Sequence, residues 1–197
     1  MKKPLLLPLI TIALAAAVLL GMSLGLKGVE KANAQAEQLR MMQTLLPGSE
    51  TFTQEAYSGE DPIIQCVHKG ETGFVIETVT NGYAGPITML VGVSKEGRVT
   101  GLVVRDMEET LGLGRNALTD HVFLAQLLNT KGDVAVGTPG ADAFSGATGQ
   151  TEADAEVYID AISGATVTSK AIVRCVNAAV GYVTGADVSS GATSWGG

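Results

Sequence analysis

The chain is 197 residues long, which is enough for one ordinary domain with additional segments. It carries 20 Asp and Glu against 13 Lys and Arg, a formal net charge of −7 at pH 7. Because nucleic-acid phosphates require Lys and Arg on the protein, we expect no nucleic-acid partner.

Residues 4–26 form an apolar stretch without a charged residue. The stretch exceeds the ~20 residues that a transmembrane helix needs. Lys2 and Lys3 precede it, so the positive-inside rule places the N-terminus in the cytoplasm and the main domain outside. A cleaved signal peptide with a site at Ala32–Ala34 is the alternative, but its apolar core is typically only ~7 to 15 residues long. We therefore predict that residues 1–26 are a cytoplasmic N-terminus and a single transmembrane helix in the cell (inner) membrane.

The region after this anchor changes composition twice. Lys27–Leu46 is rich in Ala, Gln and Glu, which indicates a helical stalk that ends at Pro47-Gly48. The segment Ser49–Pro62 is polar and predicts no regular structure. We expect a stalk and irregular segment over 27–69, a main domain over 70–184 and a flexible tail over 185–197.

Three segments are rich in β-branched residues and bounded by Gly or turn residues, which is typical of strands. They are Phe74–Val79, Ile87–Val93 and Arg98–Val104. The short turn Ser94–Gly97 joins the last two and predicts a β-hairpin, so the pairing should be antiparallel.

The second half of the chain predicts helices around a variable loop. Leu118–Leu128 has apolar residues near the helical period, whereas Lys131–Ala155 has none and predicts a mobile surface loop. A short strand over Val157–Ile162 is followed, after Gly164, by an amphipathic helix. Its expected apolar face consists of Ile172, Cys175, Val176, Ala179, Val180 and Val183. The expected fold class is α+β, a mainly antiparallel sheet with packed helices, hung from one N-terminal transmembrane helix.

The junction between the last strand and the last helix suits a phosphate. Gly164 and Ala165 have almost no side chain, so a bulky group can approach the backbone there. Free N–H groups and the positive dipole end of the helix favour an anion, and Thr166 adds a hydroxyl at that place. The alternative is that Thr166 merely caps the helix, because Thr and Ser are common helix caps.

The sequence DAISGATVTSKAIVRCVNAAV, which starts at Asp160, resembles the flavinylation motif of the FMN-binding subunits of Rnf and Na⁺-translocating NADH:quinone reductase complexes. The resemblance implies one FMN, bound covalently through its phosphate to Thr166. Asp160, Ser163, Gly164 and Ala165 would form the surrounding motif, and Thr168 would also lie at the cofactor.

Two further segments agree with this family. Gly82–Ile87 reads GYAGPI and runs into a hydrophobic strand. The segment that starts at Glu109 reads ETLGLG, where the family usually has E-T-P-G-L-G, so that Leu111 replaces a proline that would fix φ. The resemblance implies cofactor contacts by Glu109, Thr110, Gly112, Leu113 and Gly114.

The pattern D-x-x-S-G-A-T occurs three times, at Asp142–Thr148, Asp160–Thr166 and Asp187–Thr193. Only the middle copy follows a strand-like run and precedes an amphipathic helix. We therefore predict Thr166 as the attachment site, with the outer two copies either chance repeats or secondary sites.

The resemblance implies an electron-relay subunit, of the G type, in a membrane-bound ion-translocating ferredoxin:NAD⁺ oxidoreductase (Rnf). Its partners would be the other membrane subunits and a flavin transferase. It would be part of an oxidoreductase, with no catalytic residue and no stand-alone activity of its own. The alternatives are a membrane-anchored extracytoplasmic flavoprotein of another system, such as a quinone reductase or extracellular electron transfer, and a non-redox binding module in which SGAT is only a turn.

Other residues receive simpler interpretations. His68 and His121 have no partner at metal-ligand spacing, so we expect no metal site. Cys66 and Cys175 are expected to be two separately buried thiols, with a disulfide between them as the alternative. Tyr83 is assigned to core packing, although a place near the flavin stays open.

Overall fold

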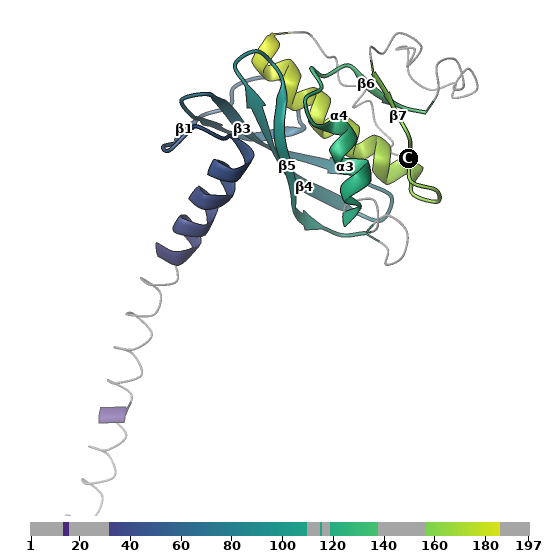
Figure 1. Cartoon of the computed structure of the whole chain (residues 1–197). Coiled ribbons are helices and arrows are strands. Elements are labelled where there is room, and N and C mark those ends of the chain that lie inside the picture. The colour runs from purple at the N-terminus through teal and green to yellow at the C-terminus, as the bar shows by residue number, and fades with distance from the viewer. Residues whose placement is uncertain (1–13, 16–31, 110–114, 116–118, 138–156, 186–197) are drawn as a thin grey trace, which may run out of the picture. The chain divides into compact units, whose positions relative to one another are not determined.

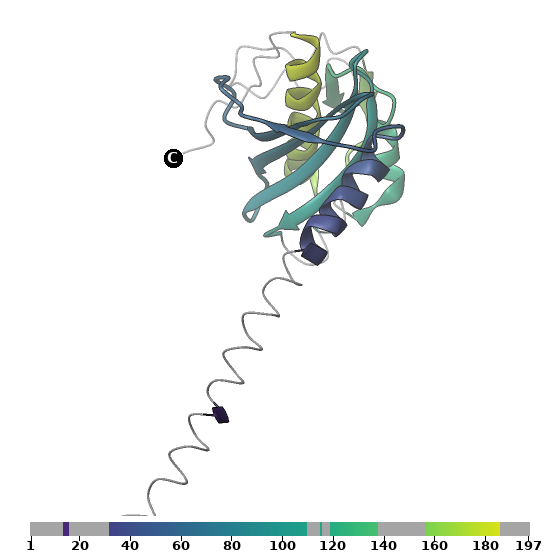
Figure 2. The ribbon, with the colours of Figure 1, turned by 90° about the vertical axis from the view of Figure 1, so that its left-hand side faces the viewer.

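The computed structural model describes residues 14–15, 32–109, 115, 119–137 and 157–185. Its central element is a five-stranded antiparallel sheet in the order β1-β2-β3-β4-β5, with helix α4 lying across one face (Figures 1 and 2). The strands are β1 (Thr53–Glu55), β2 (Ile64–Lys69), β3 (Gly73–Asn81), β4 (Pro86–Ser94) and β5 (Val99–Met107). The three strands expected from the sequence correspond to β3, β4 and β5, each slightly longer than predicted.

The hairpin between β4 and β5 forms as predicted. Gly97 has φ of +76°, a conformation that costs a residue with a Cβ, and its N–H donates to the carbonyl of Ser94 at 3.0 Å. Along β3 and β4, the pairs Ile76↔Val91 and Phe74↔Val93 place apolar side chains on one face. This face is the one that α4 covers.

Helix α4 (Thr166–Thr184) supplies the other half of the core. Ile172, Cys175, Val176 and Ala179 on it are fully buried, as the predicted apolar face requires. Complete burial of an aliphatic side chain of this size contributes about 1.5 to 3 kcal/mol. Burial of this apolar face therefore holds α4 in place against the sheet.

Helix α3 (His121–Leu127) lies within the predicted span, with Phe123 and Leu127 buried. The Asp120 carboxylate caps it, accepting hydrogen bonds from the N–H groups of Val122 at 2.8 Å and Phe123 at 3.1 Å. Leu118 lies outside the described residues.

The prediction of a loop throughout 131–155 was wrong at its start. Strand β6 (Val134–Val136) pairs in parallel with β7 (Val157–Ile159). The Asn177 side chain on α4 holds β6, since it accepts from the N–H of Val134 at 3.2 Å and donates to its carbonyl at 2.9 Å. Three residues are too few to show a strand period, and this support comes from 43 residues away.

The region before residue 70 is also more regular than expected. β1 lies in the segment that we predicted to be irregular, and β1 and β2 both join the main sheet. On β2, Ile64 and Val67 are buried among polar neighbours, so the strand shows little alternation of apolar and polar residues. The sheet consequently begins before position 70.

The helix predicted for the stalk is present over residues 32–45 and ends before Gly48, which has φ of +86°. Its end contacts the sheet face opposite α4. The Thr100 hydroxyl donates to the carbonyl of Leu45 at 2.6 Å, and Leu45 lies against Gly92 and Gly101. Glycines are required there because a side chain would occupy the space of the helix backbone.

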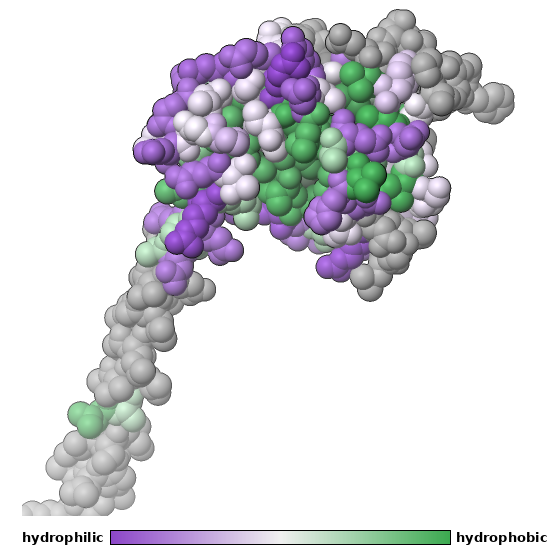
Figure 3. Space-filling view, in the orientation of Figure 1, coloured by the Kyte–Doolittle hydropathy of each residue, from purple (hydrophilic) through white to green (hydrophobic). Residues whose placement is uncertain are grey.

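Among the described residues, no helix is long and apolar enough to cross a membrane. Apart from Leu14 and Ala15, the predicted span 4–26 lies outside the described residues, as does the tail beyond 185. On the face seen in Figure 3, apolar residues gather over the middle of β5, where Leu102 and Val104 are half-buried and pack against the core.

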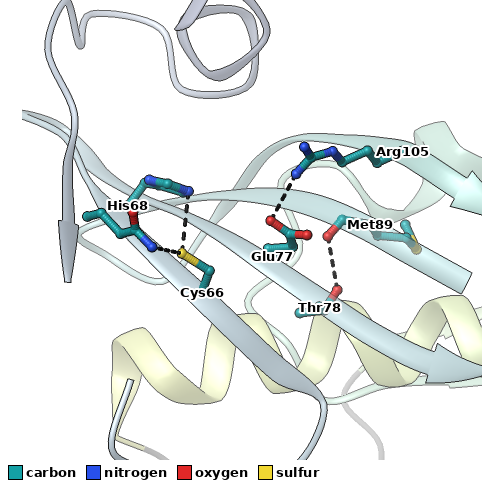
Figure 4. A network of polar contacts seen from close by, with 7 residues as sticks. Cys66, His68, Glu77, Thr78, Met89 and Arg105 are labelled. Atoms are coloured by element: carbon teal, nitrogen blue, oxygen red, sulfur yellow. Dashed lines mark hydrogen bonds and ion pairs between the residues drawn. The ribbon is translucent and has the colours of Figure 1, made fainter. Parts of the chain in front are cut away.

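Both cysteines are free thiols. Cys175 is fully buried on α4, as expected, and burial raises the pKa of its thiol to about 11. Cys66 is only half-buried, contrary to expectation, and it lies beside His68 on the sheet face away from α4 (Figure 4). Its Sγ is 3.6 Å from His68 Nε2 and accepts from Gln54 Nε2 at 3.1 Å.

Candidate anion and cofactor site at the start of helix α4

The turn that precedes α4 is shaped by its glycine. After β7, the N–H of Ala165 donates to the carbonyl of Ile162 at 2.9 Å and closes the turn. Gly164 has φ of +80° within it, a left-handed conformation that costs a residue with a Cβ roughly 1 to 2 kcal/mol. The SGAT sequence therefore has a conformational reason for its glycine.

The start of α4 offers unshared hydrogen-bond donors. The helix begins at Thr166, and its N-cap is Ala165, which has no side chain that can cap the helix. The N–H groups of the first helical turn have no carbonyl partner within a helix. The interpretation of Thr166 as the N-cap was thus wrong, because Thr166 is the first helical residue.

Thr166 lies on the surface, whereas Ala165 and Ser169 hold the turn in place. Thr166, Ser163 and Gly164 are exposed, and Ala165 is buried. The Ser169 hydroxyl on α4 accepts from the N–H of Ile162 at 3.4 Å. The surface hydroxyl is therefore held on a supported turn.

Asp160, the first residue of the motif, is exposed at the end of β7. Its N–H donates to Gln126 Oε1 on α3 at 3.1 Å. The motif is thereby tied to α3 at its beginning and to α4 at its end.

A second part of the site lies where β3 turns into β4. Glu109 Oε1 accepts from the N–H of Tyr83 at 2.7 Å and from that of Ala84 at 3.4 Å. A Cβ at position 82 would overlap this carboxylate, which explains Gly82. The structure thus joins GYAGP with the glutamate that begins ETLGLG. Tyr83 is 73% exposed on this turn, so its assignment to the core was wrong.

Arg174 connects this turn to α4, and the sequence did not indicate it. Its Nη2 donates to the carbonyl of Asn81 at 3.2 Å. Arg174 is eight residues after Thr166, or about 12 Å along the helix axis. Thr166, Lys170 and Arg174 follow one another at four-residue spacing, which places them along one side of the helix. That spacing was the available signal.

Three polar atoms in this region are buried without a hydrogen-bond partner among the described residues: Glu109 Oε2, Thr168 Oγ1 and Arg174 Nε. Leaving such an atom unsatisfied costs about 1 to 3 kcal/mol, and more where it is charged. Glu109 Oε2 is an acceptor and Arg174 Nε is a donor, and both side chains lie beside the β3–β4 turn, whereas Thr168 is fully buried on α4.

The remaining predicted site residues, Thr110, Gly112, Leu113 and Gly114, lie outside the described residues, as do Thr148 and Thr193. Their assignments stay predictions.

Fold and site together define an α+β domain that presents an uncapped helix start and an exposed hydroxyl at the first residue of one long helix. The model of the FMN-binding domain family matches residues 82–181. This match includes the β3–β4 turn, Glu109 and α4. The chain belongs to the FMN-binding domain family.

The chain is similar to G subunits of ion-translocating oxidoreductase complexes. It is 34% identical over 111 residues to the G subunit of the proton-translocating ferredoxin:NAD⁺ oxidoreductase complex of Clostridium ljungdahlii, a match that covers 56% of this chain and 53% of that protein. It is 31% identical over 187 residues to the G subunit of the ion-translocating oxidoreductase complex of Methanosarcina acetivorans, covering 89% and 90%. The chain thus matches about half the length of the first relative and most of the second.

Among solved structures, the chain is similar to the C subunit of the Na⁺-translocating NADH-quinone reductase of Parabacteroides distasonis. The two are 20% identical with a TM-score of 0.48, and the match covers 68% of this chain and 76% of that one.

The residues present fit FMN. The uncapped start of α4 and the exposed Thr166 hydroxyl suit its phosphate. The unpartnered atoms of Glu109 and Arg174, both beside the β3–β4 turn, offer polar contacts to the rest of the cofactor.

Proposed function

We propose that this chain carries one FMN covalently on Thr166 and relays electrons as the G-type subunit of an Rnf-type ion-translocating oxidoreductase. The observation that carries the proposal is the start of α4, where an exposed hydroxyl stands beside unshared helix amides. Family membership supports FMN as the ligand. The Methanosarcina relative, matched over 90% of its length, supports the assignment to an Rnf-type complex.

The site indicates which roles belong to the protein and which to the cofactor. FMN, when bound, supplies the electron-transfer chemistry. The chain's own residues would hold it: the amides of α4 orient the phosphate, and Thr166 Oγ1 provides the ester oxygen. A phosphoester keeps the cofactor on a domain that faces outward, where lost FMN would diffuse away. A flavin transferase would form the bond by moving the FMN phosphoryl group from a flavin dinucleotide to Thr166 Oγ1, with the nucleoside monophosphate leaving and the hydroxyl proton released. The motif from Asp160 to Thr166 is exposed at most positions, so an enzyme can reach it.

The proposal also places the domain outside the cell (inner) membrane, behind a single helix at residues 4–26. Other membrane subunits of the complex would then deliver and remove electrons. An extracytoplasmic flavoprotein of another electron-transfer system is the second candidate, favoured by the fact that the match to the Clostridium relative covers only 53% of that protein.

The attachment site is tested by Thr166→Ala. The change should abolish covalent flavin and leave the fold intact, because it removes one exposed hydroxyl that is not the helix cap. Thr148→Ala and Thr193→Ala are matched controls in the same D-x-x-S-G-A-T pattern. The measurement is peptide mapping of the denatured protein after co-expression with a flavin transferase. Flavin that persists on the Thr166→Ala chain, or that maps to Thr148 or Thr193 alone, would show the assignment to be wrong.

A further inference from the structure

The middle of α4, beside the β3–β4 turn, contains a cation whose hydrogen bonds are incomplete. Arg174 uses Nη2 to bind the carbonyl of Asn81 at 3.2 Å. Its Nε–H is buried and has no partner in the part of the chain that the structure describes. A guanidinium only donates, so the missing partner must be an acceptor.

The nearby Glu109 carboxylate lacks a hydrogen-bond donor, whereas Arg174 lacks an acceptor. Glu109 Oε1 binds the amides of Tyr83 and Ala84, which directly follow the Asn81-Gly82 peptide that Arg174 contacts. Glu109 Oε2 is buried and lacks a partner among the described residues. The two side chains form no ion pair within 4.0 Å in the described structure, so they do not neutralise each other directly.

An acceptor and a donor in one ligand would satisfy both groups. The pyrimidine part of a flavin ring has carbonyl oxygens that accept and one N–H that donates. The phosphate, ribityl chain and rings of FMN are joined end to end, so the rings of an FMN whose phosphate is on Thr166 can reach groups farther along α4. Arg174 lies about 12 Å along the helix from Thr166.

We propose that Arg174 is a specificity and tuning residue for the flavin, whose Nε–H donates to a ring carbonyl and whose charge stabilises the reduced cofactor. The proposal rests on the proposed function, because it requires FMN on Thr166. Reduction adds electrons, and hence negative charge, to the ring system. A fixed cation next to it favours the reduced form and raises the midpoint potential.

The test is the midpoint potential of the full chain with its FMN attached, titrated with dithionite under anaerobic conditions. Arg174→Met keeps most of the side-chain volume and removes the charge and the donors. Because the Arg174 charge interacts more favourably with the reduced ring than with the oxidised ring, the ratio of reduced to oxidised flavin at a fixed potential should fall at least about tenfold. For a two-electron couple this is a decrease of about 30 mV or more. The absorption band of the oxidised flavin should also shift, because a polar contact to the ring is lost.

Arg98→Met is the matched control. Arg98 is exposed at the opposite end of the sheet, and its Nη1 also donates to a backbone carbonyl, that of Asn129 at 3.3 Å. The two variants change the net charge equally, so only a local effect distinguishes them. Arg174→Lys keeps the charge and loses the Nε–H, and its potential should fall between those of the wild type and Arg174→Met.

The outcomes separate the two proposals. A potential and a spectrum that stay at wild-type values in both Arg174 variants would overturn the role of Arg174, even if the variants are less stable. If Arg174→Met does not fold, the same result for Arg174→Lys alone would overturn it. Absence of covalent flavin from the wild-type chain would instead refute the proposed function, and this is read independently from the mass after denaturation.

Discussion

Thr166 and Gly164 show how far a motif predicts a site at the scale of single residues. The sequence predicted that a helix follows Gly164 and that the Thr166 hydroxyl lies at its start, and the structure confirms this position. The left-handed conformation of Gly164 and the exposure of Thr166 are known only from the structure. Arg174 was missed because its partner Asn81 is 93 residues away, and only the packing of α4 against β3 brings them together. The contact with Asn81 itself leaves no pattern in the sequence, and the four-residue spacing from Thr166 places Arg174 on the side of Thr166 without naming its partner.

His68 on β2 makes a residue-level prediction about pH. It is 8% exposed, and burial lowers the pKa of its imidazole below the ordinary 6.5, although the nearby Glu77 raises it in part and Arg105 lowers it further. The unfolded chain therefore binds a proton at a higher pH than the folded one does. The contribution of the neutral His68 to the free energy of unfolding should therefore be complete above pH 6.5, and it should fall as the pH decreases from there through the lowered pKa.

The measurement is the free energy of unfolding in urea between pH 7.5 and 5. His68→Gln should flatten its dependence on pH, whereas His121→Gln, at an exposed position on α3, should leave it unchanged. An equal slope in the wild type and His68→Gln would contradict the assignment.

Among the helices and strands, the sequence predicted the ones that are long enough to show a repeating pattern of apolar residues. β3, β4 and β5 each have nine residues, and α4 has 19, so alternation and helical periodicity are visible in them. β1 and β6, which were not predicted, have three residues each and owe their pairing to neighbours. β7 forms the first half of the strand predicted over Val157–Ile162. β6 depends on the Asn177 side chain for both of its hydrogen bonds to α4. Short strands of this type follow from the tertiary structure.

The contact between the end of the helix over 32–45 and the sheet gives an element-level prediction. A Cβ at position 92 would overlap the backbone carbonyl of Leu45. Gly92→Ala should therefore displace the helix end and weaken the 2.6 Å hydrogen bond from Thr100. We expect a loss of about 1 to 3 kcal/mol in the free energy of unfolding, as for other overpacked sites.

Urea denaturation of Gly92→Ala measures this loss, and Thr100→Val tests the hydrogen bond separately. Unchanged stability in Gly92→Ala would mean that the helix end does not need this close approach.

For the whole molecule, we propose that an FMN-binding domain is joined to a membrane. The domain is a member of its family by direct comparison. The anchor is a prediction from the apolar stretch 4–26 and from Lys2 and Lys3 before it. The proposed electron route requires that the domain and the N-terminus lie on opposite sides of the membrane.

Orientation is tested with a membrane-impermeant thiol reagent on intact cells or spheroplasts. Cys66 is the partly exposed thiol, and Cys175 is fully buried with a pKa raised to about 11, so Cys66 should react first. Cys66→Ala provides the control for the site of labelling. Labelling only after lysis would place the domain in the cytoplasm and contradict the proposed route.

The central claim, a covalent flavin on this chain, is tested most directly by the intact mass of the denatured protein. The chain should be co-expressed with a flavin transferase, denatured, and separated from free cofactor before mass spectrometry. We expect the mass of the polypeptide plus one FMN joined with loss of water, and the loss of that increment in Thr166→Ala. A wild-type chain with the mass of the unmodified polypeptide, under conditions in which a known substrate of the transferase is modified, would contradict it.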